Sequence, residues 1–323
     1  MQKHLRILFA GSPAIAVPAL EAVAALCNDG EGFSLAGLLT NLDSPKGRSG
    51  KPEPTECAAA LGRLPSIPIL KPEKLDAAAR EQVKALEPDL LVSFAYGKIF
   101  GPKFLEMFPL GGINIHPSLL PKYRGPTPIP AAIIGRETET GITIQRLALE
   151  MDSGDILAQE KVPLDLRETT ASLSETMARK AAGLLPKLLR DVAAAGGLRG
   201  QAQDHGAASY CSLIAKTDGL IDWSLSAPEI DARIRAYTPW PLSWTMHGDL
   251  QLLILRAEAT PDQTRPEALP GEVLGKDGNK GILIQTGEGV LAVSELQYKT
   301  KKALEWKVFL NGARNFIGAR LGV

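Results

Sequence analysis

The stretch that decides the fold is Gly112-Ile113-Asn114-Ile115-His116-Pro117-Ser118-Leu119-Leu120-Pro121. It begins as alternating apolar residues, the period-two pattern of a strand, and then breaks into a proline-punctuated loop. Asn114 and His116 are two residues apart, so a strand places both side chains on one face at its end. A histidine there suits proton transfer near neutral pH, although a histidine at a strand end is also often only a structural hydrogen-bonding group.

The composition describes a globular chain without overall charge. Of its 323 residues, 45% are hydrophobic and 22% charged, which suits about two domains. Lys and Arg (36) balance Asp and Glu (36), so a polyanion would have to be met by a local basic patch. The dispersed Cys27, Cys57 and Cys211 argue against a disulfide framework. No signal-peptide pattern or membrane-length apolar run is found, so we expect a cytoplasmic protein.

Strand and helix patterns alternate over the first part of the chain. Short apolar runs predict buried strands and Ala-rich or amphipathic segments predict helices, so the fold class is α/β with a doubly wound, mostly parallel, Rossmann-like sheet. The turn at Gly11 lacks the G-x-G-x-x-G pattern, so we do not expect a nicotinamide cofactor. The expected strands are 5–10, 35–40, 67–70, 89–96, 112–116 and 141–147, and the expected helices 15–26, 55–61, 75–86, 127–134 and 170–194.

After residue 208 the pattern changes to short strands separated by glycine turns, which indicates a small β-barrel. We therefore expect a first domain at 1–195, a linker at 196–208 and a second domain at 209–323. Ser226 and Glu229 have the spacing of a capping box at the start of a helix. Three of the tryptophans of this part are expected to pack in the core or between domains: Trp223, Trp240 and Trp244.

Two basic segments could contact a phosphate backbone. Lys46, Arg48 and Lys51 lie in a long polar loop at 41–54, and loops of this length are often functional or disordered. Lys301 and Lys302 lie in a second basic run, after Tyr298. On charge alone, solvated surface explains both segments slightly better than phosphate contact does.

Three carboxylates, Glu150, Asp152 and Asp155, surround Gly154 between two strand patterns. A turn alone explains Asp and Gly here, because Asp side chains bond to nearby backbone amides. A partner for His116 is the alternative. A metal site of His116, Asp152 and Asp155 is not expected, because the H-x-x-x-H or cysteine spacing of such sites is missing.

Together these residues resemble a known family. Asn114, His116 and 118–121, followed by Asp152, Gly154 and Asp155, resemble the signature of the folate-dependent formyltransferases. Four further segments resemble the branch of that family that formylates methionyl-tRNA: 6–13, the loop through Pro45, Gly47 and Arg48, 221–226 and 235–241. The resemblance therefore covers essentially the whole chain. Pro117 departs from the Gly of many tRNA formyltransferases and stiffens the loop.

The resemblance implies transfer of the formyl group of 10-formyltetrahydrofolate to the α-amine of methionyl initiator tRNA, without a metal. It implies Asn114, His116 and Asp152 as catalytic residues and an OB-like second domain that binds tRNA. Arg48 matches the family's tRNA-contacting loop, and nothing demands more than a monomer. The folate site would include Ser118, Leu119, Leu120 and Pro121, with Tyr96 and Gly97 as a wall of an apolar pteridine pocket.

The chemistry explains these residue types. Attack of an amine on the formyl carbon gives a tetrahedral intermediate, whose oxyanion needs preorganised donors such as the Asn114 amide and a protonated His116. A proton must also pass from the amine to the leaving nitrogen. Asp152 would raise the pKa of His116 or orient a water. Which group is the base stays open.

Three alternatives remain. A sugar-nucleotide N-formyltransferase would use the same donor, but the basic loop and the lysine-rich run weigh against it. A hydrolase that passes the formyl group to water would not need the second domain. A catalytically silent tRNA-binding protein would have no need of Asn114, His116 and Asp152 together.

Overall fold

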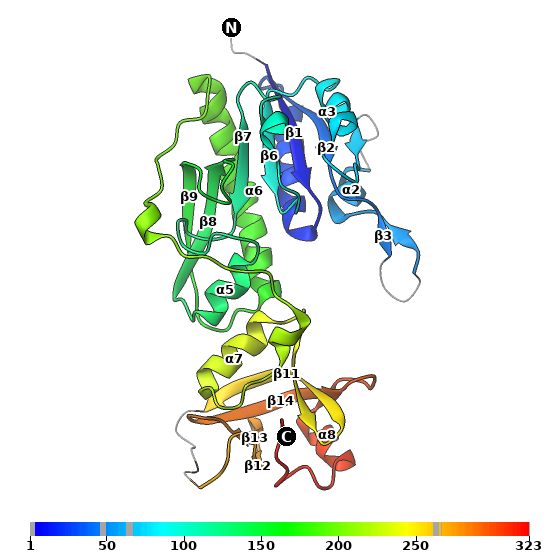
Figure 1. The fold of residues 1–323 in the computed structure, drawn as a ribbon, viewed down its shortest axis with the longest axis vertical. Helices are drawn as coiled ribbons and strands as arrows, with labels where there is room; N and C mark the ends of the chain where they lie inside the picture. The colour runs from blue at the N-terminus through cyan, green and yellow to red at the C-terminus, as the bar shows by residue number, and fades with distance from the viewer. Residues whose placement is uncertain (1–3, 46–49, 63–66, 261–264, 266, 323) are drawn as a thin grey trace. The chain divides into compact units, whose positions relative to one another are not determined.

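The computed structural model describes residues 4–45, 50–62, 67–260, 265 and 267–322 (Figure 1). The chain divides into two compact units. The first unit comprises Met1–Pro128, Glu139–Pro163 and Ser174–Cys211, and the second comprises Ile129–Thr138, Leu164–Leu173 and Ser212–Val323. The units thus interleave along the chain, and the domain limits expected from sequence stay a prediction.

The first unit is built on a seven-stranded sheet with the order β5-β2-β1-β6-β7-β8-β9. Pairing is parallel from β5 to β7 and antiparallel from β7 to β9. The prediction of a mostly parallel Rossmann-like sheet is confirmed. The strands are β1 (Leu5–Gly11), β2 (Phe33–Leu39), β5 (Ile69–Leu70), β6 (Leu90–Phe94), β7 (Gly112–His116), β8 (Glu139–Arg146) and β9 (Ile156–Pro163).

The chain runs outward from β1 to β5 in one direction and from β6 to β9 in the other. Because crossovers between parallel strands are right-handed, this reversal places α1 and α2 on one face of the sheet and α3 and α4 on the other. Thr55 and Asp76 cap α2 and α3 by accepting the backbone N–H of Ala58 and Ala79. The helices of the first unit are α1 (Val17–Asn28), α2 (Glu56–Leu61), α3 (Ala77–Lys84), α4 (Pro102–Leu105) and most of α6 (Thr170–Ala195), whereas α5 (Pro128–Ile134) belongs to the second unit from Ile129 on.

A row of four aromatic rings packs against the centre of this sheet. Tyr96, Phe100, Phe104 and Phe108 recur every four residues, and neighbouring ring centroids are 5.5, 5.3 and 5.7 Å apart. Aromatic pairs at such distances add to the free energy gained by burying their area. The row therefore fixes the segment that follows the carboxyl end of β6.

The second unit is built on an antiparallel sheet with the order β10-β11-β14-β13-β12, and β15 pairs with β14. The small β domain predicted at the C-terminus as an OB-like barrel is confirmed as an antiparallel sheet domain, and among the described residues β10 and β12 end the pairing order. Its elements are α7 (Ala227–Ala236), β10 (Ser243–His247), β11 (Leu250–Thr260), β12 (Val273–Asp277), β13 (Gly281–Gln285), β14 (Val290–Tyr298), β15 (Leu304–Glu305) and α8 (Trp306–Gly312).

The helix α7 begins as predicted, since the backbone N–H of Ser226 donates to Glu229 Oε2 at 3.0 Å. Trp223 is buried in the core of this unit, and its indole N–H donates to Thr245 Oγ1 at 3.0 Å. Trp240 is half exposed, so core packing is the wrong description for this residue. No helix among the described residues combines the length and the apolar character needed to cross a membrane.

Candidate functional site

The candidate site lies at the carboxyl end of β7 in the first unit. Sheets of this kind bind ligands in the crevice beyond the carboxyl ends of their strands, near the point where strand order reverses. Here that point lies between β1 and β6, and β7 is the next strand. The strand ends in Asn114 and His116, half-buried and buried respectively.

His116 has one ring nitrogen committed to the protein. Its Nε2 lies 2.9 Å from the backbone carbonyl oxygen of Tyr123. A carbonyl oxygen only accepts, so Nε2 carries the proton in this hydrogen bond. The other nitrogen, Nδ1, faces Asp152 Oδ2 at 3.5 Å. In the neutral ring, Nδ1 is therefore the atom able to take up a proton.

The carboxylate of Asp152 is held by three N–H groups. Its Oδ1 accepts from Gln145 Nε2 at 2.7 Å and from Asn114 Nδ2 at 3.3 Å, and its Oδ2 accepts from the Gly125 backbone N–H at 2.9 Å. These contacts aim the remaining side of Oδ2 at His116. The structure thus brings Asn114, His116 and Asp152 together, although Asp152 is 36 residues or more away from the other two in sequence.

Burial decides the protonation of His116. Removal from water disfavours the charged ring and lowers the pKa of His116 below its ordinary value. Asp152 and the Tyr123 carbonyl act in the opposite direction and are the smaller influences. The expected upward shift of the His116 pKa is therefore wrong in sign, because burial outweighs the carboxylate.

The turn that carries Asp152 has a special backbone. Asp152 has φ +53°, in the left-handed region that Asp tolerates better than most residues. At Gly154, an added Cβ would lie 1.9 Å from the Arg146 carbonyl oxygen, so this position requires glycine. Asp155 turns toward Arg146, with Oδ2 4.0 Å from Nε. Of the three carboxylates predicted here, only Asp152 faces His116.

The structure also bears on the alternative of a metal site, within the part of the chain that it describes. There, no three His, Cys, Asp or Glu side chains are grouped as metal ligands would be. Asp155 would have been the third ligand, and it faces Arg146 instead.

The loop 118–121 is organised by Thr143 on β8. Its hydroxyl donates to the Ser118 carbonyl at 2.7 Å and accepts from the Leu120 N–H at 3.2 Å and from Gln159 Nε2 at 2.8 Å. Ser118 and Leu120 are buried, whereas Leu119 and Pro121 are partly exposed. The side chains of Ser118 and Leu120 therefore shape this loop, and Leu119 and Pro121 are its accessible members.

The segment after β6 has an accessible apolar side chain that the sequence reasoning missed. Tyr96 is buried in the aromatic row, where burial raises its pKa to about 12, while Gly97 is exposed with φ +82°. Ile99 is 81% exposed. Asn41 Nδ2 donates to the Tyr96 carbonyl at 2.9 Å and ties this segment to the end of β2. Ile99, rather than the Tyr96 ring, thus offers an apolar surface.

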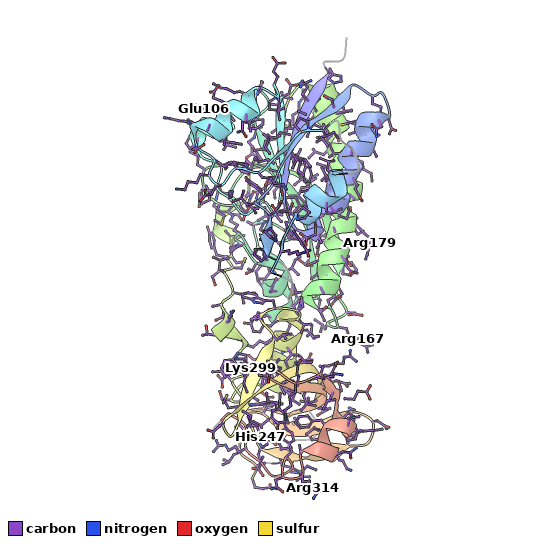
Figure 2. The ribbon with its side chains drawn as sticks, turned by 90° about the vertical axis from the view of Figure 1, so that its right-hand side faces the viewer. Glu106, Arg167, Arg179, His247, Lys299 and Arg314 are labelled. Atoms are coloured by element: carbon purple, nitrogen blue, oxygen red, sulfur yellow. The ribbon has the colours of Figure 1, made fainter. Side chains whose placement is uncertain are left out.

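The predicted tRNA-contacting residues are placed only in part. Lys46 and Arg48 lie outside the described residues. Lys51 is exposed next to a short hairpin of β3 (Ser44–Pro45) and β4 (Pro52–Glu53). In the second unit Lys301 and Lys302 are exposed, and Lys301 Nζ lies 5.8 Å from the Tyr298 ring centroid. Figure 2 labels two further cations of this unit, Lys299 and Arg314.

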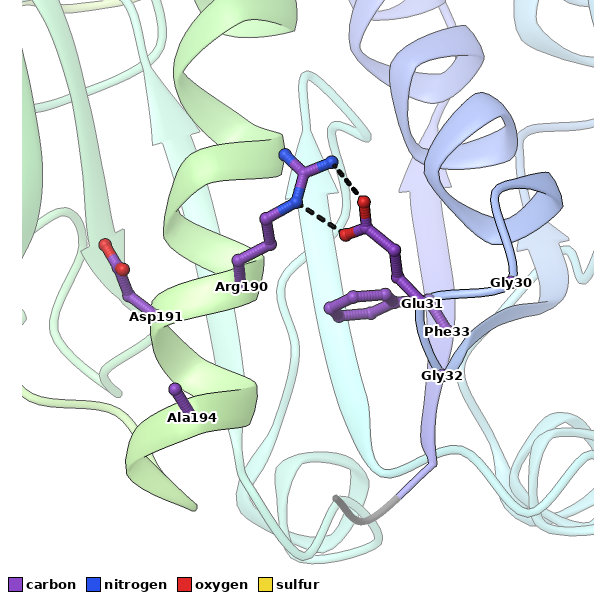
Figure 3. A pocket seen from close by; sticks show the side chains of 7 residues that line it. All are labelled: Gly30, Glu31, Gly32, Phe33, Arg190, Asp191 and Ala194. Atoms are coloured by element: carbon purple, nitrogen blue, oxygen red, sulfur yellow. Dashed lines mark hydrogen bonds and ion pairs between the residues drawn. The ribbon is translucent and has the colours of Figure 1, made fainter. Parts of the chain in front are cut away.

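A surface pocket of the first unit lies at other residues. Its lining includes the loop 30–33, Arg190, Asp191 and Ala194. Arg190 on α6 and Glu31 form a bidentate ion pair there, with N–O distances of 2.6 and 3.1 Å (Figure 3). Both side chains are partly exposed, and this pocket contains none of the predicted site residues.

Comparison with known protein families identifies the class of this chain as a transferase. The sequence profile described as formyl transferase matches residues 6–189, and the profile of the formyl transferase C-terminal domain matches residues 213–314. The chain belongs to the formyl transferase family. The resemblance inferred from the motifs of the sequence is thereby confirmed.

Named relatives are similar over nearly their whole length. The methionyl-tRNA formyltransferase of Treponema denticola is 48% identical over 97% of this chain and 98% of its own. That of Chloroflexus aggregans is 41% identical over 95% and 97%. Two solved structures share the fold at low identity. An N-formyltransferase from Helicobacter canadensis, in complex with folinic acid and dTDP-3-aminofucose, aligns with a TM-score of 0.63 at 18% identity over 90% of this chain and 99% of its own. HypX from Aquifex aeolicus, in complex with tetrahydrofolic acid, aligns with 0.63 at 16% over 98% and 48%.

Proposed function

We propose that this protein is an enzyme that transfers the formyl group of 10-formyltetrahydrofolate to the α-amine of methionyl initiator tRNA. The products are N-formylmethionyl-tRNA, which serves translation initiation, and tetrahydrofolate. Both relatives described above carry the name methionyl-tRNA formyltransferase and align over nearly the full chain, which supports the acceptor. Membership of the formyl transferase family supports the reaction.

The observation that carries this proposal is the position of His116 Nδ1, 3.5 Å from Asp152 Oδ2 beside the Asn114 amide. The amine attacks the formyl carbon, and the carbonyl oxygen becomes an oxyanion. Asn114 uses one amide N–H toward Asp152, and its second N–H can donate to the oxyanion. Asn114 therefore acts as the oxyanion donor.

His116 handles the proton in this proposal. Once the amine has added to the formyl carbon, its nitrogen is positively charged, and the neutral ring takes a proton from that nitrogen at Nδ1, while the carboxylate of Asp152 stabilises the imidazolium that forms. Collapse of the intermediate returns the proton to the folate nitrogen as the carbon–nitrogen bond to it breaks. The resting enzyme has a neutral His116, since burial lowers the pKa of the ring.

The folate donor would lie between the loop 118–121 and the segment after β6. The protein offers three partly or largely exposed apolar side chains there: Leu119, Pro121 and Ile99. At Gly97, the exposed backbone is not covered by a side chain. Apolar walls with a few backbone polar groups suit a pteridine ring. Ser118 and Leu120 would hold the loop in shape from beneath, and Tyr96 would support Gly97.

We assign tRNA contact to two groups of cations. Lys46, Arg48 and Lys51 would neutralise phosphates near the methionyl end, and Lys301 and Lys302 would contact the tRNA from the OB-like second domain. A sugar-nucleotide acceptor carries a single diphosphate and would not need two separate groups of cations. We also retain the domain limits 1–195, 196–208 and 209–323, a cytoplasmic location and a monomer as parts of this proposal.

The test measures tetrahydrofolate release from 10-formyltetrahydrofolate with three acceptors: methionyl initiator tRNA, a 4-amino-sugar nucleotide, and water. We expect release with the tRNA alone. Release with the sugar nucleotide or with water would keep the formyl chemistry and replace the acceptor. Absence of release with all three, in protein that still binds tRNA, would mean a silent tRNA-binding protein.

A further inference from the structure

A buried guanidinium lies behind the candidate site. Arg124 is 1% exposed. Its Nε and Nη2 donate to Gln203 Oε1 at 3.1 and 2.8 Å, and other contacts reach Tyr210 Oη at 3.4 Å and His205 Nδ1 at 3.2 Å. These three partners are neutral acceptors. Burying a charge is costly unless it is hydrogen-bonded, so this arrangement calls for a reason.

Gln203 joins Arg124 to the turn that carries Asp152. Its side chain is buried, and its Nε2 lies 2.9 Å from the Asp152 carbonyl oxygen and 2.7 Å from the Gly154 carbonyl oxygen. The same Nε2 lies 3.2 Å from Gln145 Oε1, so its two hydrogens are shared among three acceptor oxygens, of which the Gln145 oxygen is the most distant. Gln203 therefore holds the backbone of the turn on both sides of Ser153.

The guanidinium of Arg124 influences which way the side-chain amides of Gln203 and Gln145 face. Arginine only donates hydrogen bonds, so the oxygen of Gln203 must face Arg124 and its NH₂ must face the carbonyl oxygens. Gln145 then presents its oxygen to Gln203, which leaves its NH₂ to donate to Asp152 Oδ1 at 2.7 Å. The orientation of the Gln145 amide thus agrees with both of its neighbours, because Gln203, oriented by Arg124, faces the Gln145 oxygen and the acceptor oxygen of Asp152 faces its NH₂.

We propose that Gln203 is a positioning residue, which keeps the Asp152 carboxylate opposite His116 by clamping the turn and orienting Gln145. This inference rests on the proposed function. It also gives the segment 196–208, expected from sequence to be a linker, a part in the active site. Gln203 touches no reacting atom, so its contribution passes through Asp152.

The experiment compares full-length Gln203→Ala and Gln203→Glu with the wild type. The matched control is Gln201→Ala, because Gln201 lies two residues away with an exposed side chain. Displacement of a catalytic group by about 1 Å costs roughly 10²-fold in rate. We expect kcat for formyl transfer to fall by roughly 10–100-fold in both Gln203 variants. We expect the KM for 10-formyltetrahydrofolate to change by less than about 3-fold, because uniform substrate binding is untouched.

A second readout follows His116 directly by NMR titration of its ring, one of four histidines in the chain. Asp152 supports the charged ring, so a displaced carboxylate lowers the His116 pKa further. We expect this shift in Gln203→Ala and none in Gln201→Ala. If Gln203 only stabilised the fold, the His116 titration in the folded variant would be the same as in the wild type.

Gln203→Glu tests the amide orientation and serves if Gln203→Ala does not fold. The glutamate side chain has the same size as glutamine and can accept hydrogen bonds from Arg124. Its second carboxylate oxygen, however, would replace the NH₂ group and lie next to three carbonyl oxygens. Wild-type kcat and wild-type His116 titration in a folded Gln203 variant would overturn the proposal. If the wild type releases no tetrahydrofolate with any acceptor, the proposed function fails, and the titration still decides the positioning role.

Discussion

The Nδ1 atom of His116 faces the Oδ2 atom of Asp152 at 3.5 Å, while the Nε2 atom of the same ring is occupied by the Tyr123 carbonyl. The ring can therefore exchange its proton on one side only. Asp152 in turn is fixed by Gln145, Asn114 and Gly125, so both partners have a set orientation.

Replacement of the carboxylate tests this pair. Asp152→Asn keeps the size of the side chain and suits the left-handed backbone, but removes the negative charge beside His116. We expect kcat to fall by about 10²–10⁴-fold, the range of general acid–base catalysis. Steady-state kinetics with methionyl initiator tRNA give the value, and circular dichroism checks the fold. Near-wild-type kcat would remove Asp152 from the mechanism.

The pH dependence of stability follows from burial of His116. Its pKa is lower in the folded protein than in the unfolded chain, where it is about 6.5. The unfolded chain therefore binds the proton first as the pH falls, and His116 destabilises the fold progressively between pH ~6.5 and its lowered pKa. Urea unfolding at pH 7.5 and 5.5 should show a smaller loss of stability in His116→Asn than in the wild type. An equal loss in both proteins would contradict the downward shift.

The loop 118–121 should depend on the Thr143 hydroxyl. Thr143→Val leaves the buried Leu120 N–H and Ser118 carbonyl without this partner, and unpaired buried groups cost about 1–3 kcal/mol each. We expect the free energy of unfolding to fall by about 3 kcal/mol and the KM for 10-formyltetrahydrofolate to rise.

Thr140→Val is the matched control for that change. Thr140 lies on the same strand, and its buried hydroxyl has no hydrogen-bond partner among the described residues. We expect Thr140→Val to be neutral or slightly stabilising. If the two variants lose equal stability in denaturant titrations, the hydroxyl network of Thr143 does not hold the loop.

The double variant Lys301→Ala/Lys302→Ala should weaken tRNA binding. Removal of one lysine–phosphate interaction reduces the dependence of log K on log salt by about 1. We expect a higher KM for the tRNA with a shallower salt dependence, and an unchanged kcat at saturating tRNA. Lys103→Ala, an exposed lysine at α4 of the first unit, is the control. A salt slope equal to that of the wild type would exclude these lysines from the tRNA interface.

The ion pair between Arg190 and Glu31 should matter little. Although it lowers the pKa of Glu31, both groups face solvent, where water and salt screen the charges, so the pair contributes little to stability. We expect Arg190→Ala to keep wild-type kcat and KM and to shift the urea midpoint only slightly. A large loss of activity would mean that the pocket beside Arg190 has a functional role.

Local patterns in the sequence predicted much of this protein. The alternation of apolar runs predicted the sheet, and the two-residue spacing placed Asn114 and His116 on one strand face. The capping box at Ser226 was recognisable because its two residues are three positions apart. These features depend on neighbours in sequence, which is why they could be read from it.

The remaining features depend on contacts between distant segments. Gln203 is 51 residues from Asp152, and an isolated glutamine in a Gly- and Ala-rich segment carries no pattern. The sign of the His116 pKa shift is set by how deeply the ring is buried, and the sequence does not contain that quantity. Trp240 looks like a core residue by type, yet the fold leaves it half exposed.

The left-handed backbone at Asp152 also has an evolutionary consequence. Besides glycine, asparagine and aspartate are the residues that adopt this conformation most readily. An Asp codon becomes an Asn codon through one base change. A gene copy released from selection is therefore a single mutation away from a protein that keeps its shape and loses its chemistry. Such a descendant would be recognised by an asparagine at position 152.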